Sequence, residues 1–209
     1  GPSPNTNSDY TPESHARAIR QTLDALGVTQ PITLVGHSMG ALIALKFTDM
    51  YPEKVKKLIL ANMPIYKTAE EAKTDITQSK RRKRLAYYGL SSHLLCTTWC
   101  YGLRPISKRV APKYLHHLPK EVAADSVLHS WRSYSESLRH VVANQTVQTN
   151  LKGLTIQTTL LYGKKESKVV LENVRTLGHL PKNIEVVLLD ATHALPLEKQ
   201  KELLGYIRK

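Results

Sequence analysis

The chain has 209 residues, of which 41% are hydrophobic and 22% are charged. This composition is typical of one globular domain with a substantial core and room for a small inserted subdomain, and it argues against wholesale disorder. No apolar run approaches the roughly 18 residues that a membrane-spanning helix needs, and no signal peptide is visible, so we expect a cytoplasmic protein.

Basic residues outnumber acidic ones, and the formal net charge is +13. Such a charge can indicate a nucleic-acid partner or docking to an anionic membrane. The cations are spread along the chain, however, and the one dense block, at 80–84, comes with no zinc-finger, RRM or KH signature. We interpret this block as a solvated helix face and expect no nucleic-acid partner. Peripheral membrane contact, an acidic partner and an anionic substrate stay open as alternatives.

The two cysteines, Cys96 and Cys100, lie close together in the sequence. On a helix they would share one face, where a disulfide would be strained. Together with His93 they do not make a standard zinc ligand set. We therefore predict two ordinary, semi-buried thiols and no metal site.

The first predicted elements alternate between helix and strand. Thr11 is a good N-cap, Pro12 fits the first helical position, and apolar residues recur at helical spacing until Gly27 ends the helix. A strand, a helix and a second strand joined by short links then predict a parallel sheet, and they cover 31–35, 41–50 and 55–61.

The pattern changes after Pro64, and no strand alternation is visible until the sheet pattern resumes. Helix-like stretches, punctuated by prolines, cover 69–88, 91–101, 107–118 and 120–145. We predict a helical cap at 65–150, whose aromatic residues could roof an apolar pocket, inserted into a core formed by 1–64 and 151–209. The later elements of that core are two strands, a short helix between them and a closing helix, at 156–162, 184–189, 174–177 and 198–207.

A short motif joins the first predicted strand to the next helix: Gly36-His37-Ser38-Met39-Gly40, which fits G-x-S-x-G. A serine at the tip of a tight strand-to-helix turn has a strained backbone, and its flanks need almost no side chain, so we expect Gly36 and Gly40 to supply that room. The N-terminus of the next helix then directs N–H groups at the reacting centre. The motif predicts Ser38 as a nucleophile; the alternative is an inert serine in a glycine-rich turn.

Two further residues complete a candidate catalytic set. His193 follows the last predicted strand, so its loop emerges at the same carboxyl edge of the sheet as Ser38, where it can act as the base that a serine hydroxyl needs. Glu166 follows the preceding strand at that edge and can orient His193; the alternative is a surface carboxylate beside Lys164 and Lys165. Asp190 is the rival acid, but it lies so near His193 in the sequence that we expect it to anchor the loop.

In chain order these motifs resemble the α/β-hydrolase superfamily, in its serine esterase, lipase and C–C hydrolase branch. Residues 35–41 resemble the nucleophile elbow of that family, 161–166 its acid-bearing strand end and 191–193 its histidine loop. The resemblance implies an α/β-hydrolase fold, in which helices flank a mostly parallel sheet and the helical insertion is a cap. It also implies a triad of Ser38, Glu166 and His193, the Met39 N–H as an oxyanion-hole donor, and no cofactor.

One departure from the family pattern concerns the start of the chain. In the family, several strands precede the segment that begins here, and a loop after one of them donates a second oxyanion-hole N–H. We therefore expect this chain to be the C-terminal part of the fold. Either a separate N-terminal segment completes the sheet, or the chain alone is impaired in catalysis.

The predicted function is hydrolysis of an ester or related acyl bond in a small-molecule substrate, through a Ser-His-Glu triad and an acyl-enzyme. One alternative is a non-catalytic binding protein that keeps the α/β-hydrolase fold. Another is a basic surface that docks to anionic membranes or nucleic acid.

Overall fold

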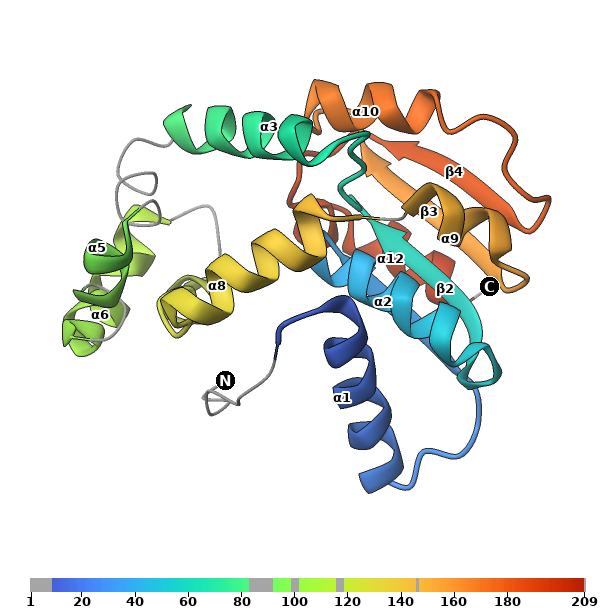
Figure 1. Cartoon of the computed structure of the whole chain (residues 1–209), viewed down its shortest axis with the longest axis horizontal. Coiled ribbons are helices and arrows are strands. Elements are labelled where there is room, and N and C mark those ends of the chain that lie inside the picture. The colour runs from blue at the N-terminus through green and yellow to red at the C-terminus, as the bar shows by residue number, and fades with distance from the viewer. Residues whose placement is uncertain (1–8, 83–91, 99–101, 116–118, 146, 209) are drawn as a thin grey trace. The chain divides into compact units, whose positions relative to one another are not determined.

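The computed structural model describes residues 9–82, 92–98, 102–115, 119–145 and 147–208 (Figure 1). The chain divides into two compact units. The core unit comprises Tyr10–Asp75 with Arg139–Lys209, and the helical unit is built on Ile76–Leu138. That residues 65–150 act as a cap stays a prediction.

A four-stranded parallel sheet is the centre of the core unit. Its strands pair in the order β1-β2-β3-β4, which confirms the predicted parallel sheet, and they span Ile32–His37, Val55–Ala61, Gln157–Gly163 and Ile184–Leu189. The register aligns the strand ends, with His37 opposite Ala61 and Gly163 opposite Leu189. The loops after the four strands therefore leave the sheet at one edge.

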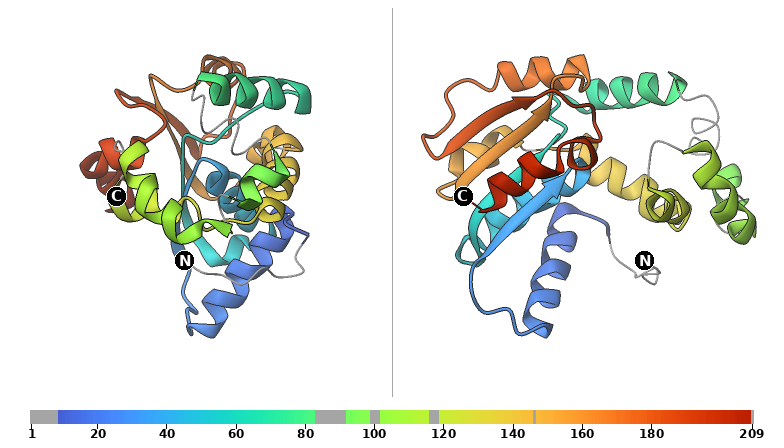
Figure 2. Two further views of the ribbon diagram at one scale, coloured as in Figure 1. Left: turned by 90° about the vertical axis from the view of Figure 1, so that its left-hand side faces the viewer. Right: turned by 180° about the vertical axis from the view of Figure 1, so that it is seen from behind.

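The two central strands carry most of the core, because helices cover both faces of the sheet. Leu58, Ile59, Leu60, Leu160 and Leu161 are all fully buried. Helix α2 (Met39–Met50) packs on β1 and β2, and α1 (Pro12–Ala25) packs on α2. Figures 1 and 2 show α12 (Gln200–Arg208) on the opposite face.

A buried lysine helps to fix α12 on its face of the sheet. Lys57, on β2, is 7% exposed, and its Nζ donates to the Tyr206 carbonyl at 2.6 Å. Because Tyr206 lies in the last turn of α12, the ammonium group meets the negative end of the helix dipole. Leu203, Tyr206 and Ile207 pack beside it against the cluster around Ile59 and Leu161.

Helix α1 begins and ends where the sequence predicts. The Thr11 hydroxyl accepts the Ser14 N–H at 3.2 Å, Pro12 occupies the first helical turn, and Gly27 closes the helix with a φ of 67°. Two helices belong partly to each unit: α3 (Ala69–Arg82) and the π-helix η3 (Leu138–Ala143). The remaining elements of the core unit are η1 (Pro52–Lys54), α9 (Val147–Gly153), α10 (Lys168–Arg175) and α11 (Leu195–Glu198).

Two helix predictions were wrong, and one helix was missed. The single helix expected at 120–145 is divided. Helix α7 ends at Asp125, and a capping box between Ser130 and Ser133 starts a new helix, α8, at Trp131. The short helix expected at 174–177 is the end of the longer α10, which begins after Ser167. Helix α9 was not predicted.

The helical unit contains α5 (His93–Thr97), α6 (Arg104–Tyr114), α7 (Lys120–Asp125) and α8 (Trp131–Ser137). Trp131 packs against a small cluster of Cys96, Ala111 and Val127. Cys96 is 1% exposed, which makes it more buried than predicted, and its Sγ lies 3.5 Å from the His129 Nε2. Cys100 and the side chains of the basic block at 80–84 lie outside the described residues. Along the described part of the chain, no helix has the length and apolar character needed to cross a membrane.

The two glycines of the G-x-S-x-G motif differ in the space around them. A Cβ at Gly36 would lie 2.6 Å from both the Cα of Ala41 and the carbonyl oxygen of Gly40. A Cβ at Gly40 would meet no described atom within 4 Å. The expectation that both glycines supply room is therefore right for Gly36 and wrong for Gly40, where there is space for a Cβ.

This difference predicts that alanine substitutions at the two glycines change the free energy of unfolding in different directions. Gly36→Ala should lower the free energy of unfolding by about 1–3 kcal/mol, because backbone atoms would have to move. Gly40→Ala should leave it unchanged or raise it by about 0.5–1 kcal/mol, because Gly40 lies inside α2. Urea denaturation of both variants tests this; equal losses of stability would contradict it.

Candidate active site

Ser38 occupies the sharp turn between β1 and α2. Its φ of 55° and ψ of −126° are strained for a residue with a Cβ. Two backbone hydrogen bonds hold the turn: the Ser38 N–H donates to Ala61 O, and the Ala41 N–H donates to Ser38 O, both at 2.9 Å. Met39 begins α2, so its N–H belongs to the first turn, whose donors have no partner within the helix.

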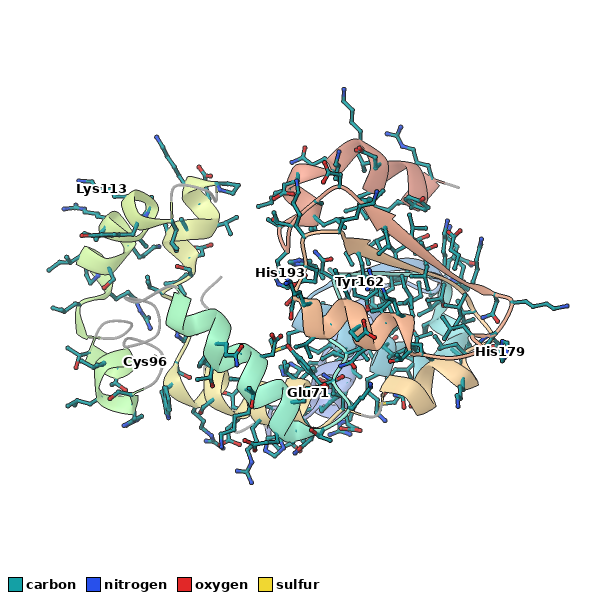
Figure 3. All side chains as sticks on the ribbon, turned by 90° about the horizontal axis from the view of Figure 1, so that it is seen from above. Glu71, Cys96, Lys113, Tyr162, His179 and His193 are labelled. Carbon is teal, nitrogen blue, oxygen red and sulfur yellow. The ribbon has the colours of Figure 1, made fainter. Side chains whose placement is uncertain are left out.

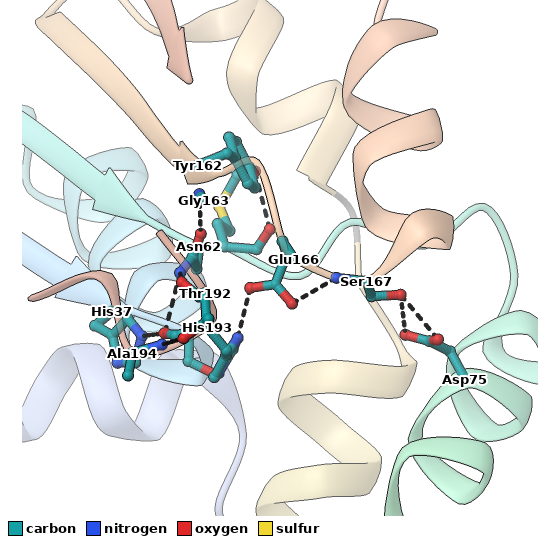
Figure 4. Close-up of polar contacts among 12 residues, drawn as sticks. His37, Asn62, Asp75, Tyr162, Gly163, Glu166, Ser167, Thr192, His193 and Ala194 are labelled. Atoms are coloured by element: carbon teal, nitrogen blue, oxygen red, sulfur yellow. Dashed lines mark hydrogen bonds and ion pairs between the residues drawn. The ribbon is translucent and has the colours of Figure 1, made fainter. Parts of the chain in front are cut away.

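The His193 ring lies between Ser38 and Glu166. Its Nε2 is 3.0 Å from the Ser38 Oγ, and its Nδ1 is 2.6 Å from the Glu166 Oε2 (Figure 4). Because a carboxylate only accepts, Nδ1 carries the proton and Nε2 is free to accept the Ser38 hydroxyl proton.

Figure 3 shows His179, which precedes β4, at the far end of the core unit from His193.

Glu166 is the carboxylate that faces the ring. Its side chain is 9% exposed. Burial alone would raise the pKa of Glu166, but the hydrogen bond and charge of His193, together with the Ser167 N–H, outweigh burial and hold that pKa below its ordinary value. The exposed Asp190 does not contact the ring: its Oδ1 lies 3.0 Å from the Lys165 Nζ, an ion pair that joins the histidine loop to the loop carrying Glu166.

Two residues that the sequence reasoning missed hold the backbone of the histidine loop. The His193 carbonyl accepts from the His37 Nε2 at 2.8 Å and from the Asn62 Nδ2 at 3.0 Å. The Asn62 amide also donates to Thr192 O at 3.0 Å and accepts the Gly163 N–H at 2.8 Å. Asn62 is 1% exposed and thus links the ends of β2 and β3 to the histidine loop.

His37 must donate through Nε2 to reach that carbonyl. Burial and the nearby His193 ring lower the pKa of His37, although the hydrogen bond to His193 O opposes the shift. A neutral imidazole with its proton on Nε2 fits this contact. The residue before the proposed nucleophile therefore connects the Ser38 turn to the backbone of His193.

Close backbone contact joins the loop after β3 that carries Glu166, here called the acid loop, to the histidine loop. A Cβ at Gly163 would lie within 3 Å of two carbonyl oxygens, those of Ala191 and Thr192, and the Lys165 N–H donates to Ala191 O at 3.0 Å. The far side of the histidine loop is held by Glu198 of α11, which accepts the Thr192 N–H at 2.8 Å. These contacts fix the distance between the two loops.

A cavity of about 230 Å³ lies away from this site, between α1, α2 and the segment 140–150. Two of its charged lining residues, Glu13 and Lys46, already pair with each other at 3.0 Å. Nowhere in the described chain do three or more His, Cys, Asp or Glu side chains gather in a way that could hold a metal ion.

Comparison with known proteins assigns the family. The family model described as alpha/beta hydrolase fold matches residues 1–200, so the chain belongs to the α/β-hydrolase family, as the motifs suggested. Among curated proteins it is similar to homoserine O-acetyltransferase of Thermus thermophilus, at 49% identity over 49 residues. Those residues are 23% of this chain and 13% of that protein, so the chain spans only part of the length of this curated relative.

Solved structures share the fold along the whole chain. An esterase from Exiguobacterium antarcticum has a TM-score of 0.69 at 21% identity, and a bromoperoxidase from Bacillus anthracis has 0.70 at 18%. In both cases the match covers 100% of this chain and 78% of the other. The likeness confirms the predicted α/β-hydrolase fold. One of these proteins is named an esterase and the other a bromoperoxidase, so the fold alone does not identify the chemistry.

The role of Asn62 predicts a sharp response to one substitution. Asn62→Asp places a carboxylate oxygen against the carbonyls of Thr192 and His193, so it should cost more stability than Asn62→Ala. We expect the alanine variant to lose about 1–3 kcal/mol of unfolding free energy and the aspartate variant more. Asn144→Asp, an exposed control, should change it by less than about 0.5 kcal/mol. Urea denaturation at neutral pH measures all three, and an aspartate variant as stable as the wild type would rule out the contact.

Proposed function

We propose that this chain carries the catalytic site of a serine hydrolase that cleaves an ester or related acyl bond of a small molecule. The observation that carries the proposal is the continuous line of hydrogen bonds from the Ser38 hydroxyl through the His193 ring to the Glu166 carboxylate. Family membership supports it, because a nucleophile elbow with this chain order is typical of α/β-hydrolases.

In the proposed reaction, Ser38 Oγ attacks the acyl carbon while His193 Nε2 takes the hydroxyl proton. Glu166, which its lowered pKa keeps ionised, stabilises the imidazolium that forms. The N–H of Met39, at the start of α2, donates to the developing oxyanion. Collapse of the tetrahedral intermediate breaks the bond to the leaving group, and the imidazolium returns the proton to it.

Water completes the cycle. His193 takes a proton from water as the water oxygen attacks the acyl-enzyme. The bond from the acyl carbon to the Ser38 Oγ then breaks, and the imidazolium returns the proton to that oxygen, which releases the acid as second product. The His193 side chain is 55% exposed, so water and substrate can reach the ring. Four points stay predictions: a second oxyanion-hole donor, a segment that completes the sheet, the role of 65–150 as a cap, and a cytoplasmic location.

Turnover of p-nitrophenyl esters of graded chain length tests the proposal. Ser38→Ala should reduce hydrolysis to background, because no nucleophile remains. Glu166→Gln keeps the shape of the acid but not its charge, and it should lower kcat at least about a hundredfold. Ser14→Ala, on α1 and outside the site, should retain full activity.

A Ser38→Ala variant as active as the wild type would contradict the proposed nucleophile. A fluorophosphonate probe gives the second measurement, because it needs an activated hydroxyl but no productive substrate pocket. Labelling of Ser38 without turnover of any ester would instead favour a non-catalytic protein that keeps the fold.

A further inference from the structure

A second carboxylate, from a distant part of the chain, holds the loop that carries Glu166. Ser167 donates its backbone N–H to the Glu166 Oε1 at 2.8 Å (Figure 4). The Ser167 hydroxyl lies 2.9 Å from each carboxylate oxygen of Asp75, on α3, which is 92 residues away in the sequence. An unbroken set of hydrogen bonds thus runs from Asp75 through Ser167 and Glu166 to the His193 ring.

Tyr66 supplies the second contact of Asp75. The Tyr66 hydroxyl donates to the Asp75 Oδ2 at 3.0 Å. Burial, the negative charge of Asp75 and this hydrogen bond all raise the pKa of Tyr66, so the phenol stays protonated and donates. Within the described chain, the groups that donate to the Asp75 carboxylate are these two hydroxyl groups. Its carboxylate is therefore available to fix hydroxyl positions.

One turn earlier, α3 makes a separate contact with the element that follows the acid loop. The Glu71 Oε2 accepts the Asn173 Nδ2 at 2.8 Å, and the same amide donates to Ile65 O at 3.0 Å. Asn173 is 2% exposed and lies on α10. The start of α3 is thus held at two points, through Glu71 to Asn173 on α10 and through Asp75 to Ser167.

We propose that Asp75 is a positioning residue, which through Ser167 keeps Oε1 of Glu166 occupied so that Oε2 faces His193 Nδ1. Its catalytic consequence rests on the proposed function. The physical reason is the length of the acid: a glutamate has one more rotatable bond than an aspartate and loses more side-chain entropy when it is held in one geometry. The hydrogen bond from the Ser167 N–H can restrain the Glu166 side chain only while Asp75 holds Ser167 in place.

The most direct readout is the tautomer of His193, because the position of Glu166 decides which ring nitrogen carries the proton. Ring ¹⁵N shifts of histidine-labelled protein, assigned with His193→Gln and read where the ring is neutral, report it without any substrate. We expect the wild type to hold the proton on Nδ1 and Asp75→Ala to show a mixture of both tautomers. Asp75→Asn, which keeps one acceptor oxygen, should lie between them. Glu70→Ala removes an exposed carboxylate from the same helix and should match the wild type.

Kinetics supply the second readout. Loss of one restraining hydrogen bond should lower kcat about tenfold in Asp75→Ala while KM stays within about twofold, since Asp75 does not contact the substrate. Ser167→Ala keeps the backbone N–H but removes the hydroxyl. It should reproduce this effect, and the double variant should be no worse than either single one. Ser167→Ala and Asp75→Asn also keep the test valid if Asp75→Ala does not fold.

The two proposals fail in different ways. A wild type that turns over no ester would overturn the proposed function, while the tautomer measurement would still decide the role of Asp75. A wild-type His193 ring without its proton on Nδ1, or a tautomer ratio equal in the wild type, Asp75→Asn and Ser167→Ala, would overturn the positioning role.

Discussion

The parallel register of four strands is the constraint on which the site depends. Because β1, β2, β3 and β4 end at one edge of the sheet, the loops that carry Ser38, Glu166 and His193 meet there although up to 155 residues separate them in the sequence. The burial of β2 and β3 makes this register costly to shift, since a slip would expose apolar side chains and misplace the loops.

The strand register brings the loops together only approximately, and hydrogen bonds to the backbone of the histidine loop then fix the position of His193. The carbonyl of His193 receives the Asn62 amide and the His37 ring, so the backbone of the proposed base is fixed independently of its side chain. The ring keeps its two nitrogens for Ser38 and Glu166. This arrangement suits a base, because the fixed backbone leaves Nε2 to exchange protons with Ser38 while Nδ1 stays hydrogen-bonded to Glu166.

The sequence predicted what depends on local pattern and strand order. Ser38, Glu166 and His193 could be placed because each follows a recognisable strand, and Asn62 carries the same signal directly after β2 although it was not singled out. Asp75 could not be found, because only the path of α3 in space brings it to Ser167. The break within 120–145 was missed because a short serine capping box outweighs the helical periodicity around it.

A crystal structure of the protein after reaction with a phosphonate ester tests the central claim most directly. The account predicts a covalent bond from phosphorus to the Ser38 Oγ, with the phosphoryl oxygen within hydrogen-bond distance of the Met39 N–H and His193 Nε2 facing the position of the leaving group. Phosphorus attached to any other residue, or a Ser38 adduct whose phosphoryl oxygen points away from the start of α2, would contradict it.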